Sequence, residues 1–370
     1  MRELENSLLQ LVRLGFGHTD NTEITENVDW VAVKNLAEKQ GLSAIVLDGI
    51  DKANNKLTNR PPKAMMLEWI GEVIQIYEAR YKQYEKAIGE LAGFYAQHDI
   101  KMMVLKGYTC SLDWPKPAHR SCGDIDIWLF GKQKEADKIL GEWFLIHDSG
   151  LKIDTSHHHH TVFNWKGFTV ENHYDFVNVH AHKSSAELEK IFKELGQDDS
   201  HFVGITDALT GLITKVYQPS PNLHALFLIK HMVSHFASAE ISLRQVLDWG
   251  FFVEKHHEEV DWSWLLGLLE KYHMKEFFKI INAICIDNLD FSASIFPTVQ
   301  FLPEIKDRVL VDIINPAYGA AEPVSLFPRQ LYRLKRWHGN AWKQKLCYNE
   351  SRRSMFWNGL LAKMLKPSSI

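Results

Sequence analysis

Two aspartates one residue apart are the feature of this sequence best suited to chemistry. Asp124 and Asp126 begin the alternating run at residues 124–130, which predicts a strand. Residues two apart on a strand project from the same face, so both carboxylates are expected to point together while Ile125 and Ile127 face the core. Carboxylates on one face need a positive partner, and Mg2+, which prefers oxygen ligands, would supply it.

A third acid is expected from the later strand-like run at residues 168–176. Glu171 is the preferred candidate, and His173, two residues on, would share its face. Asp175 is next on that face and is the fallback acid. Such a set of carboxylates suits phosphoryl or nucleotidyl transfer, in which two metal ions about 3.5–4 Å apart stabilise the attacking and leaving oxygens.

Candidate phosphate-binding residues precede the aspartates. Gly107 ends a short apolar run, residues 101–107, that predicts a buried strand, and a glycine there lets the backbone approach a phosphate. Lys106 and Arg120 flank the acids and would neutralise a triphosphate. Alternatively, Lys106 pairs with Asp113, and Arg120 is a structural partner of one of the two aspartates. The other candidate nucleotide-binding residues are Thr109, Ser111 and Gly123.

This region resembles the polymerase-beta-like nucleotidyltransferase superfamily and, within it, a bacterial family of uncharacterised nucleotidyltransferases. The pattern that carries the resemblance comprises Leu105-Lys106-Gly107, Arg120, Gly123-Asp124-Ile125-Asp126 and Glu171-Asn172-His173. The resemblance implies Mg2+-dependent transfer of a nucleoside monophosphate from an NTP, expected to be ATP, to an acceptor. It also implies that Asp124 and Asp126 hold both metals, and that Glu171 ligates one metal and activates the acceptor hydroxyl.

The elements that must position these residues form an α+β protein. We expect a polymerase-beta-like nucleotidyltransferase core, a small mixed sheet with helices, at residues 101–184. An N-terminal helical region at residues 1–100 is expected before it. A C-terminal helical domain at residues 185–327 and a basic helical tail at residues 328–370 are expected after it.

Individual residues mark the ends of several elements. Asp29 precedes an apolar-periodic segment that ends at Gly41, so an N-cap and a C-cap are expected there. Residues 166–167, Lys-Gly, are expected to join two strands as a hairpin. Arg244 and Asp248 are four residues apart on an expected helix, which favours an ion pair.

Histidines gather near the expected site. His157–His160 form a run of four, and neutral imidazole is a common metal ligand. On a strand, alternate members of the run face opposite sides, so at most two are expected to share a site. His231 and His235 are expected to share one face of a helix. The residues assigned to a candidate substrate cleft are His173, Asp175, His231 and His235.

Composition limits the class of protein. The chain has 370 residues, of which 45% are hydrophobic and 24% charged, as in soluble globular proteins. No stretch approaches the ~18 apolar residues of a membrane span, and no signal peptide is recognisable, so we expect a cytoplasmic protein without a membrane partner. Its four cysteines form no CxxC pair, which argues against a disulfide framework or a cysteine zinc site.

Charge is distributed unevenly along the chain. The net charge is −4, yet the segment from Pro328 onward holds ten Lys or Arg and a single acid, Glu350. Trp337, Trp342 and Trp357 lie among these basic residues. One interpretation is a surface for nucleic acid or another polyanion. We favour a basic helix pair that packs on the acidic body through its tryptophans.

The leading hypothesis is a nucleotidyltransferase whose acceptor is a small molecule, a protein side chain or an RNA end. An alternative is a catalytically decayed nucleotide-binding protein on the same fold. Tyr108 favours that alternative, since the superfamily usually has serine after the glycine, whereas the intact Asp124, Asp126 and Glu171 oppose it. A third hypothesis is a histidine-based metallohydrolase.

Overall fold

Six strands among the described residues form one mixed sheet: β1 (Met103–Val104), β2 (Ile125–Trp128), β3 (His160–Trp165), β4 (Phe168–His173), β5 (Phe202–Thr206) and β6 (Ile213–Tyr217). Their order across the sheet is β3-β4-β2-β1-β6-β5. β2 is parallel to β4 and antiparallel to β1, and β1 is parallel to β6. The hairpins β3-β4 and β5-β6 complete the sheet.

The other elements are helical. Those before the last strand are α1 (Glu3–Phe16), α2 (Trp30–Gln40), α3 (Ser43–Ala53), α4 (Lys63–Glu72), a π-helical segment (Val73–Glu78), α5 (Ala79–Ala96), α6 (Tyr108–Ser111), α7 (Gln133–His147) and α8 (Ser185–Leu195). Those after it are α9 (Pro221–Ser238), α10 (Leu243–His256), α11 (Trp262–Lys271), α12 (Lys275–Leu289), α13 (Pro303–Ile314), α14 (Leu326–Gly339) and α15 (Ala341–Cys347).

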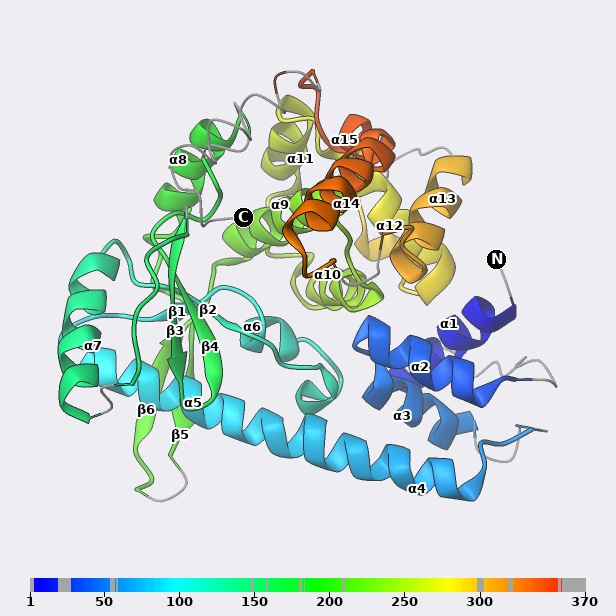
Figure 1. Ribbon diagram of the computed structural model, residues 1–370, viewed down its shortest axis with the longest axis horizontal. Helices are drawn as coiled ribbons and strands as arrows, with labels where there is room; N and C mark the ends of the chain where they lie inside the picture. The colour runs from blue at the N-terminus through cyan, green and yellow to red at the C-terminus, as the bar shows by residue number, and fades with distance from the viewer. Residues whose placement is uncertain are drawn as a thin grey trace. The chain divides into compact units, whose positions relative to one another are not determined.

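The computed structural model describes residues 3–18, 28–53, 57, 59–147, 150–157, 159–179, 182, 184–207, 210–297, 303–318, 322–351 and 354. The chain divides into two units, each assembled from separate segments (Figure 1). Unit 1 comprises Met1–Ala79, Asp113–Ser121 and Leu228–Asn349, and unit 2 comprises Arg80–Leu112, Cys122–Phe227 and Glu350–Ile370. Unit 2 contains the whole sheet. This interleaved division differs from the four consecutive segments expected from the sequence.

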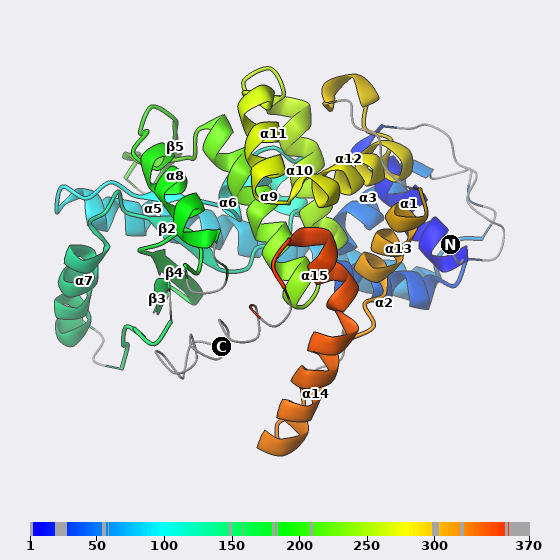
Figure 2. The same ribbon diagram turned by 90° about the horizontal axis from the view of Figure 1, so that it is seen from above.

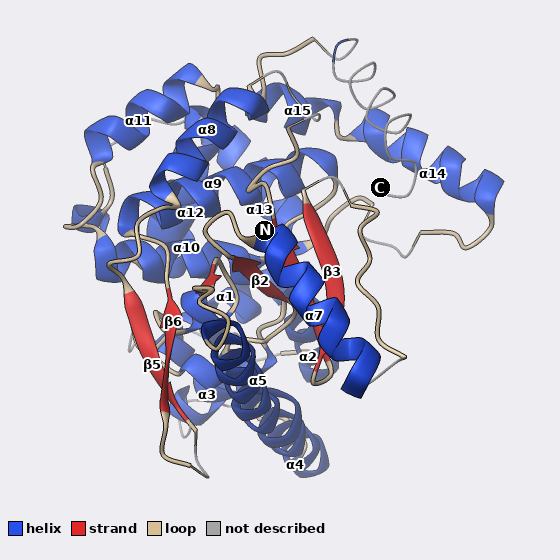
Figure 3. Ribbon diagram, turned by 90° about the vertical axis from the view of Figure 1, so that its left-hand side faces the viewer, coloured by secondary structure: helices blue, strands red, loops and turns tan. Residues whose placement is uncertain are grey.

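The strand register gives the two faces of the sheet different characters. Asp126 pairs with Glu171 across β2 and β4, and Trp128 pairs with His173, so acids and histidine share one face. The opposite face is covered by α5 and α7, which lie on the viewer's side of the strands in Figure 3. On that face the indole of Trp165 donates to the carbonyl of Ala87 on α5 (3.1 Å). The functional side chains therefore project away from α5 and α7.

Several local expectations are confirmed. The Asp29 side chain accepts from the backbone of Ala32 (3.0 Å) at the start of α2, and Gly41 ends that helix with a φ of 70°. Lys166 and Gly167, with φ of 53° and 86°, join β3 to β4 as a hairpin. The two caps of α2, Asp29 and Gly41, supply hydrogen-bond partners that the first and last turns of a helix lack, so these signals act locally.

The expectation of helix throughout the segment after residue 185 is wrong. β5 and β6 lie there as an antiparallel hairpin, and Met103 of β1 pairs with Tyr217 of β6. The expected first strand is also shorter, because β1 comprises only Met103–Val104. The pairing of β1 with β6 joins segments more than one hundred residues apart, which periodicity within one window does not reveal.

Unit 1 is helical in its described residues. α10, α13 and α15 pack against α12 (Figures 1 and 2). α1 and α3 approach so closely that a Cβ on Gly49 would lie 2.0 Å from the carbonyl oxygen of Leu11. No helix among the described residues combines the length and the apolar character required to cross a membrane.

Candidate active site

Asp126 and Glu171 form the centre of the site in unit 2. Asp126 is 1% exposed and Glu171 is 24% exposed at the side chain. Nε2 of His173 lies 3.2 Å from Oδ1 of Asp126 and 3.6 Å from Oε2 of Glu171. One ligand atom from each of these three residues lies within 4.8 Å of the others. The parallel pairing of β2 with β4 therefore brings together an acid of each strand and a histidine.

Lys106 supplies positive charge to this cluster. Its Nζ lies 3.1 Å from Oδ1 of Asp126, and its side chain is 20% exposed. Burial disfavours the ammonium charge, but attraction to Asp126, Asp124 and Glu171 outweighs this effect and raises the pKa of Lys106. Lys106 therefore pairs with the predicted site, and the alternative partner, Asp113, instead lies 3.2 Å from His256 in unit 1.

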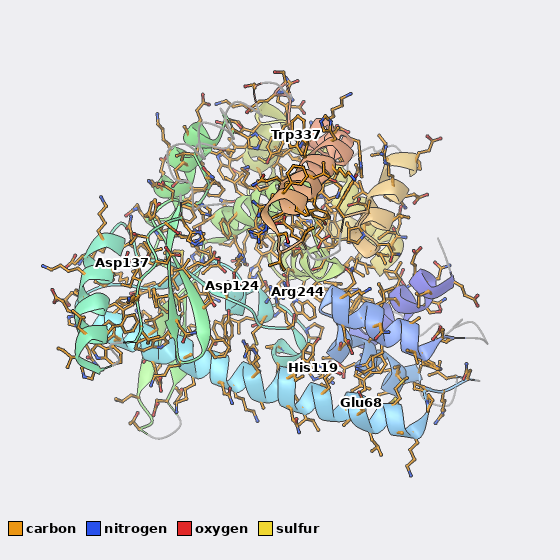
Figure 4. All side chains as sticks on the ribbon, viewed as in Figure 1. Glu68, His119, Asp124, Asp137, Arg244 and Trp337 are labelled. Atoms are coloured by element: carbon orange, nitrogen blue, oxygen red, sulfur yellow. The ribbon has the colours of Figure 1, made fainter. Side chains whose placement is uncertain are left out.

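Asp124 lies immediately before β2 and is half-buried. Its backbone carbonyl accepts a hydrogen bond from the hydroxyl of Tyr84 (2.7 Å). Its carboxylate acts on the same Lys106 ammonium as Asp126 and Glu171 do. Figure 4 labels Asp124 at the end of the segment that leads into β2. Asp124 thus belongs to the same electrostatic cluster from a position outside the regular strand.

His173 and Glu171 stabilise each other's charged forms. Burial opposes charge on both. The close contact with His173, together with His160 and Lys106, lowers the pKa of Glu171 to about 2, and the contacts with Asp126 and Glu171 raise the pKa of His173 to about 9. Nδ1 of His173 donates to the carbonyl of Asp175 (3.2 Å), which fixes the orientation of the ring. At neutral pH the Glu171 carboxylate is therefore ionised beside two cations, Lys106 and His173.

The residues of this cluster fit a divalent cation. Oδ2 of Asp126 is buried and has no hydrogen-bond partner among the described residues. A buried carboxylate oxygen without a partner is costly, and a hard cation is the partner such an oxygen prefers. Asp126 and Glu171 are the first candidates to hold Mg2+, with Asp124 beside them.

The chain matches a family model described as "Uncharacterised nucleotidyltransferase" over residues 26–289. It belongs to this family. The match covers β1, β2 and β4, which carry or adjoin the carboxylates, and continues to the end of α12. No curated protein and no solved structure matches the chain.

The glycine of this nucleotidyltransferase's Leu-Lys-Gly motif has a steric role. Gly107 has a φ of 69°, and a Cβ there would lie 2.5 Å from the hydroxyl of Tyr84. Both the backbone conformation and the close approach require glycine. By contrast, Gly123 is exposed, and a Cβ there would meet nothing within 4 Å. The motif therefore packs the turn after β1 against the residue that holds Asp124.

The two hydroxyls expected to contact phosphate are directed into the protein. Oγ1 of Thr109 donates to the carbonyl of Val104 (2.7 Å), and Oγ of Ser111 donates to the carbonyl of Tyr108 (2.5 Å). Both residues are at most 5% exposed. Their positions favour a structural role in the turn after β1 over the expected phosphate contact.

Arg120 is held within unit 1 by Asp248. Its Nε and Nη2 donate to the two carboxylate oxygens of Asp248 at 2.7 and 2.8 Å, and the indole of Trp114 also donates to Oδ1 (2.9 Å). Arg244, the expected partner of Asp248, donates to the carbonyl and hydroxyl of Ser121 (Figure 4). This geometry favours the structural alternative for Arg120, with Asp248 as the carboxylate in place of Asp124 or Asp126.

The remaining cleft candidates lie in both units. His231 and His235 share a face of α9, with ring centroids 4.3 Å apart, as their spacing predicts, and both belong to unit 1. Asp175, the fallback acid, belongs to unit 2 and forms an ion pair with Lys193. Glu171 rather than Asp175 therefore lies with Asp126 and His173.

A half-buried acid behind the site was not singled out from the sequence. Asp137 on α7 accepts from Nδ2 of Asn172 (2.8 Å) and from Oγ1 of Thr161 (3.0 Å), which lie on β4 and β3 (Figure 4). Its place beside Ala136 and Leu140, on the buried side of an amphipathic helix, was the available signal. Asp137 therefore connects α7 to the hairpin that carries Glu171.

Proposed function

We propose that this chain transfers a nucleoside monophosphate from an NTP, with ATP the first candidate, to a hydroxyl acceptor in a Mg2+-dependent reaction on a polymerase-beta-like core. Membership of a nucleotidyltransferase family supports the general reaction. The observation that carries the specific proposal is the cross-strand pair of Asp126 and Glu171, in which one buried oxygen of Asp126 has no hydrogen-bond partner among the described residues.

Each side chain has a distinct role in this proposal. Asp124, Asp126 and Glu171 would hold Mg2+, whose chemistry is to stabilise negative charge on the attacking and leaving oxygens. Lys106, partly exposed beside these acids, would attract the triphosphate. Glu171, ionised through its contact with His173, would accept a hydrogen bond from the acceptor hydroxyl and orient it. His173 positions Glu171 and Asp126.

Transfer of label from an α-labelled NTP tests the proposal. The chain would be incubated with each labelled nucleotide, Mg2+, and a pool of metabolites, RNA and protein, and the labelled product identified by mass. We expect Asp126→Asn to lower the rate by at least about 100-fold, since removal of one group that stabilises transition-state charge costs about this much. Asp199→Asn, an equivalent change at an exposed acid of unit 2, is the matched control.

The same experiment separates an active enzyme from a decayed one. Labelling that persists in Asp126→Asn would show that the site is assigned wrongly. If no product is labelled, titration of ATP with and without Mg2+ follows. Metal-dependent binding without transfer would establish the nucleotide-binding alternative, and no metal-dependent binding would contradict the site altogether.

A further inference from the structure

Three histidine rings converge beside the carboxylates. One ring nitrogen from each of His159, His160 and His173 lies within 4.8 Å of the others. The ring centroids are 4.3 Å apart for His159 and His160, 5.6 Å for His159 and His173, and 5.2 Å for His160 and His173. All three residues belong to unit 2.

The backbone explains how two adjacent histidines reach one place. His160 is the first residue of β3 and pairs with His173 of β4, so these two rings lie on the face that carries Glu171. His159 precedes the strand, and its carbonyl accepts from the backbone N–H groups of Tyr174 and Asp175 (3.0 Å each). Strict alternation does not apply before the strand begins, so the adjacent His159 and His160 can both face His173, and two members of the run share this place.

Two ring nitrogens of this trio have no hydrogen-bond partner among the residues that the structure describes. They are Nδ1 of His159 and Nδ1 of His160, and both are buried; Oε2 of Glu171 lies 3.9 Å from Nδ1 of His160, beyond hydrogen-bonding distance. An imidazole nitrogen normally finds a partner when buried, so each of these atoms needs one. The third ring is held by the Nδ1 contact to the carbonyl of Asp175, which is how proteins commonly orient a histidine that ligates a metal.

We propose that His159, His160 and His173 bind a transition-metal ion of the Zn2+ or Co2+ class, next to the Asp126–Glu171 pair. Three imidazoles suit these ions, whereas Mg2+ prefers oxygen ligands. Tetrahedral Zn2+ with Zn–N distances of about 2.05 Å places ligand nitrogens about 3.4 Å apart. The nitrogens here lie within 4.8 Å of one another, so small side-chain rotations bring them to that spacing.

The histidine site and the carboxylate site share one residue. His173 contacts Asp126 and Glu171 and also belongs to the histidine trio. An ion held by the histidines therefore competes with the two acids for the same imidazole. Coupling between two binding sites is reciprocal, so we expect the affinity for Mg2+ to change when the histidine site is filled.

Co2+ binding gives a readout that is independent of enzyme activity. The full chain, prepared without a histidine tag and stripped with a chelator, would be titrated with Co2+ while visible absorption is recorded, and the bound ion then displaced with Zn2+. We expect one equivalent to bind with tetrahedral or five-coordinate bands. His159→Gln and His160→Gln should each weaken Zn2+ binding by about 100-fold or more, since even the loss of an outer-shell partner weakens binding 10–100-fold.

A second histidine pair provides the matched control. His231 and His235 have ring centroids 4.3 Å apart on α9, where an adventitious metal could bind. The His231→Gln/His235→Gln double variant should keep the full Co2+ spectrum. Loss of the spectrum in this control, or an unchanged spectrum in His159→Gln, would overturn the proposal. His159→Gln is the decisive variant because His159 is only half-buried, and far-ultraviolet circular dichroism would verify that it folds.

One further variant separates this inference from the proposed function. Asp126→Asn should lower the rate of nucleotidyl transfer by at least about 100-fold while it retains one equivalent of Co2+. Transfer by the parent chain together with an absence of any stoichiometric Co2+ or Zn2+ binding would overturn only the histidine site. Stoichiometric binding at the histidines without transfer would overturn only the proposed function.

Discussion

The surrounding side chains compensate the buried charge of Asp126. Its carboxylate is almost fully buried, and Lys106 and His173 both contact Oδ1, at 3.1 and 3.2 Å. Removal of a buried charge from water is costly unless a partner and hydrogen bonds compensate it. Those contacts serve one oxygen, and the other has no hydrogen-bond partner among the described residues. The residue is therefore stable in the fold and still suited to a further positive ligand.

Replacement of Gly107 by alanine should destabilise the chain. In Gly107→Ala the new Cβ would lie 2.5 Å from the hydroxyl of Tyr84, and the alanine would have to keep a backbone φ of 69°. We expect the variant to lose about 1–3 kcal/mol of unfolding free energy, since a non-glycine residue in this backbone conformation is strained. Urea unfolding measures this loss.

A double variant separates the clash from the backbone strain. Tyr84→Phe removes the hydroxyl, and with it the hydrogen bond to the carbonyl of Asp124. We expect Gly107→Ala to cost less in the Tyr84→Phe background than in the parent, because the contacting oxygen is gone. Equal costs in the two backgrounds would show that the close approach has no part in the requirement for glycine.

At the scale of elements, the site depends on how the β3-β4 hairpin is held. Asp137 of α7 accepts hydrogen bonds from Thr161 of β3 and Asn172 of β4, the latter 0% exposed. Asn172 lies between Glu171 and His173, with its side chain on the opposite face of the sheet. A change at Asp137 therefore acts on the site through the backbone of β4.

We predict that Asp137→Ala destabilises the chain and lowers transfer activity together. The variant leaves the buried amide of Asn172 without its acceptor, at a cost of about 1–3 kcal/mol. Asp137→Asn retains an acceptor oxygen and should lose less. Unfolding free energy and kcat/KM would be compared with those of Glu135→Ala, an exposed acid on the same helix. Equal stability of Asp137→Ala and Glu135→Ala would contradict this role.

Glu189 makes the attachment of α8 dependent on pH. Its carboxylate accepts from the backbone N–H groups of Phe176 and Val177 (3.1 and 3.0 Å) and is 6% exposed. Burial and the nearby Asp175 raise its pKa from the usual 4.5 to about 7, against the opposing effects of the two hydrogen bonds and Lys193. The folded state therefore binds the Glu189 proton more tightly than the unfolded state does.

The parent chain should become less stable as the pH rises through the pKa of Glu189. Because the folded pKa is raised, the stabilisation is fully present below about pH 4.5 and is lost as the pH rises through 7. Between pH 5 and pH 8 the parent should lose on the order of 2–3 kcal/mol more unfolding free energy than Glu189→Gln, which does not titrate. Urea midpoints measured across this range test it, and parallel pH profiles of the two proteins would contradict it.

Two residues of the basic tail, Trp342 and Lys343, pack within unit 1. Trp342 of the basic tail lies edge-on to Phe236 (5.6 Å) and beneath the guanidinium of Arg308 (4.0 Å). Lys343 is 2% exposed and pairs with Asp312. These contacts agree with the packing interpretation for this tryptophan. Trp357 lies outside the described residues, and nothing here tests the alternative interpretation, which is polyanion binding by the tail.

Ligand binding should change the stability of the whole chain. A ligand that binds only the folded state adds about 2.7 kcal/mol at 100 times its Kd. We therefore predict that Mg2+ with a non-hydrolysable NTP raises the Tm of the parent and of Asp199→Asn. Asp126→Asn should lose the increase. An equal increase in Asp126→Asn would show that the nucleotide and metal bind without this carboxylate.

The sequence by its periodicity determined which neighbouring residues share one face of a strand. Alternation placed Asp126 opposite Ile125 and Ile127, and the same argument selected Glu171 and His173 as neighbours on one face of the later strand. Such signals are reliable because they depend on the geometry of a few consecutive residues.

Tertiary structure alone decided which distant segments meet. The pairing of β1 with β6, the ion pair between Arg120 and Asp248, and the convergence of His159 on His173 each join parts of the chain that no local pattern relates. The physical reason is that a strand or a helix can satisfy its own backbone pattern with many partners. Burial and charge compensation in the folded chain select one of them.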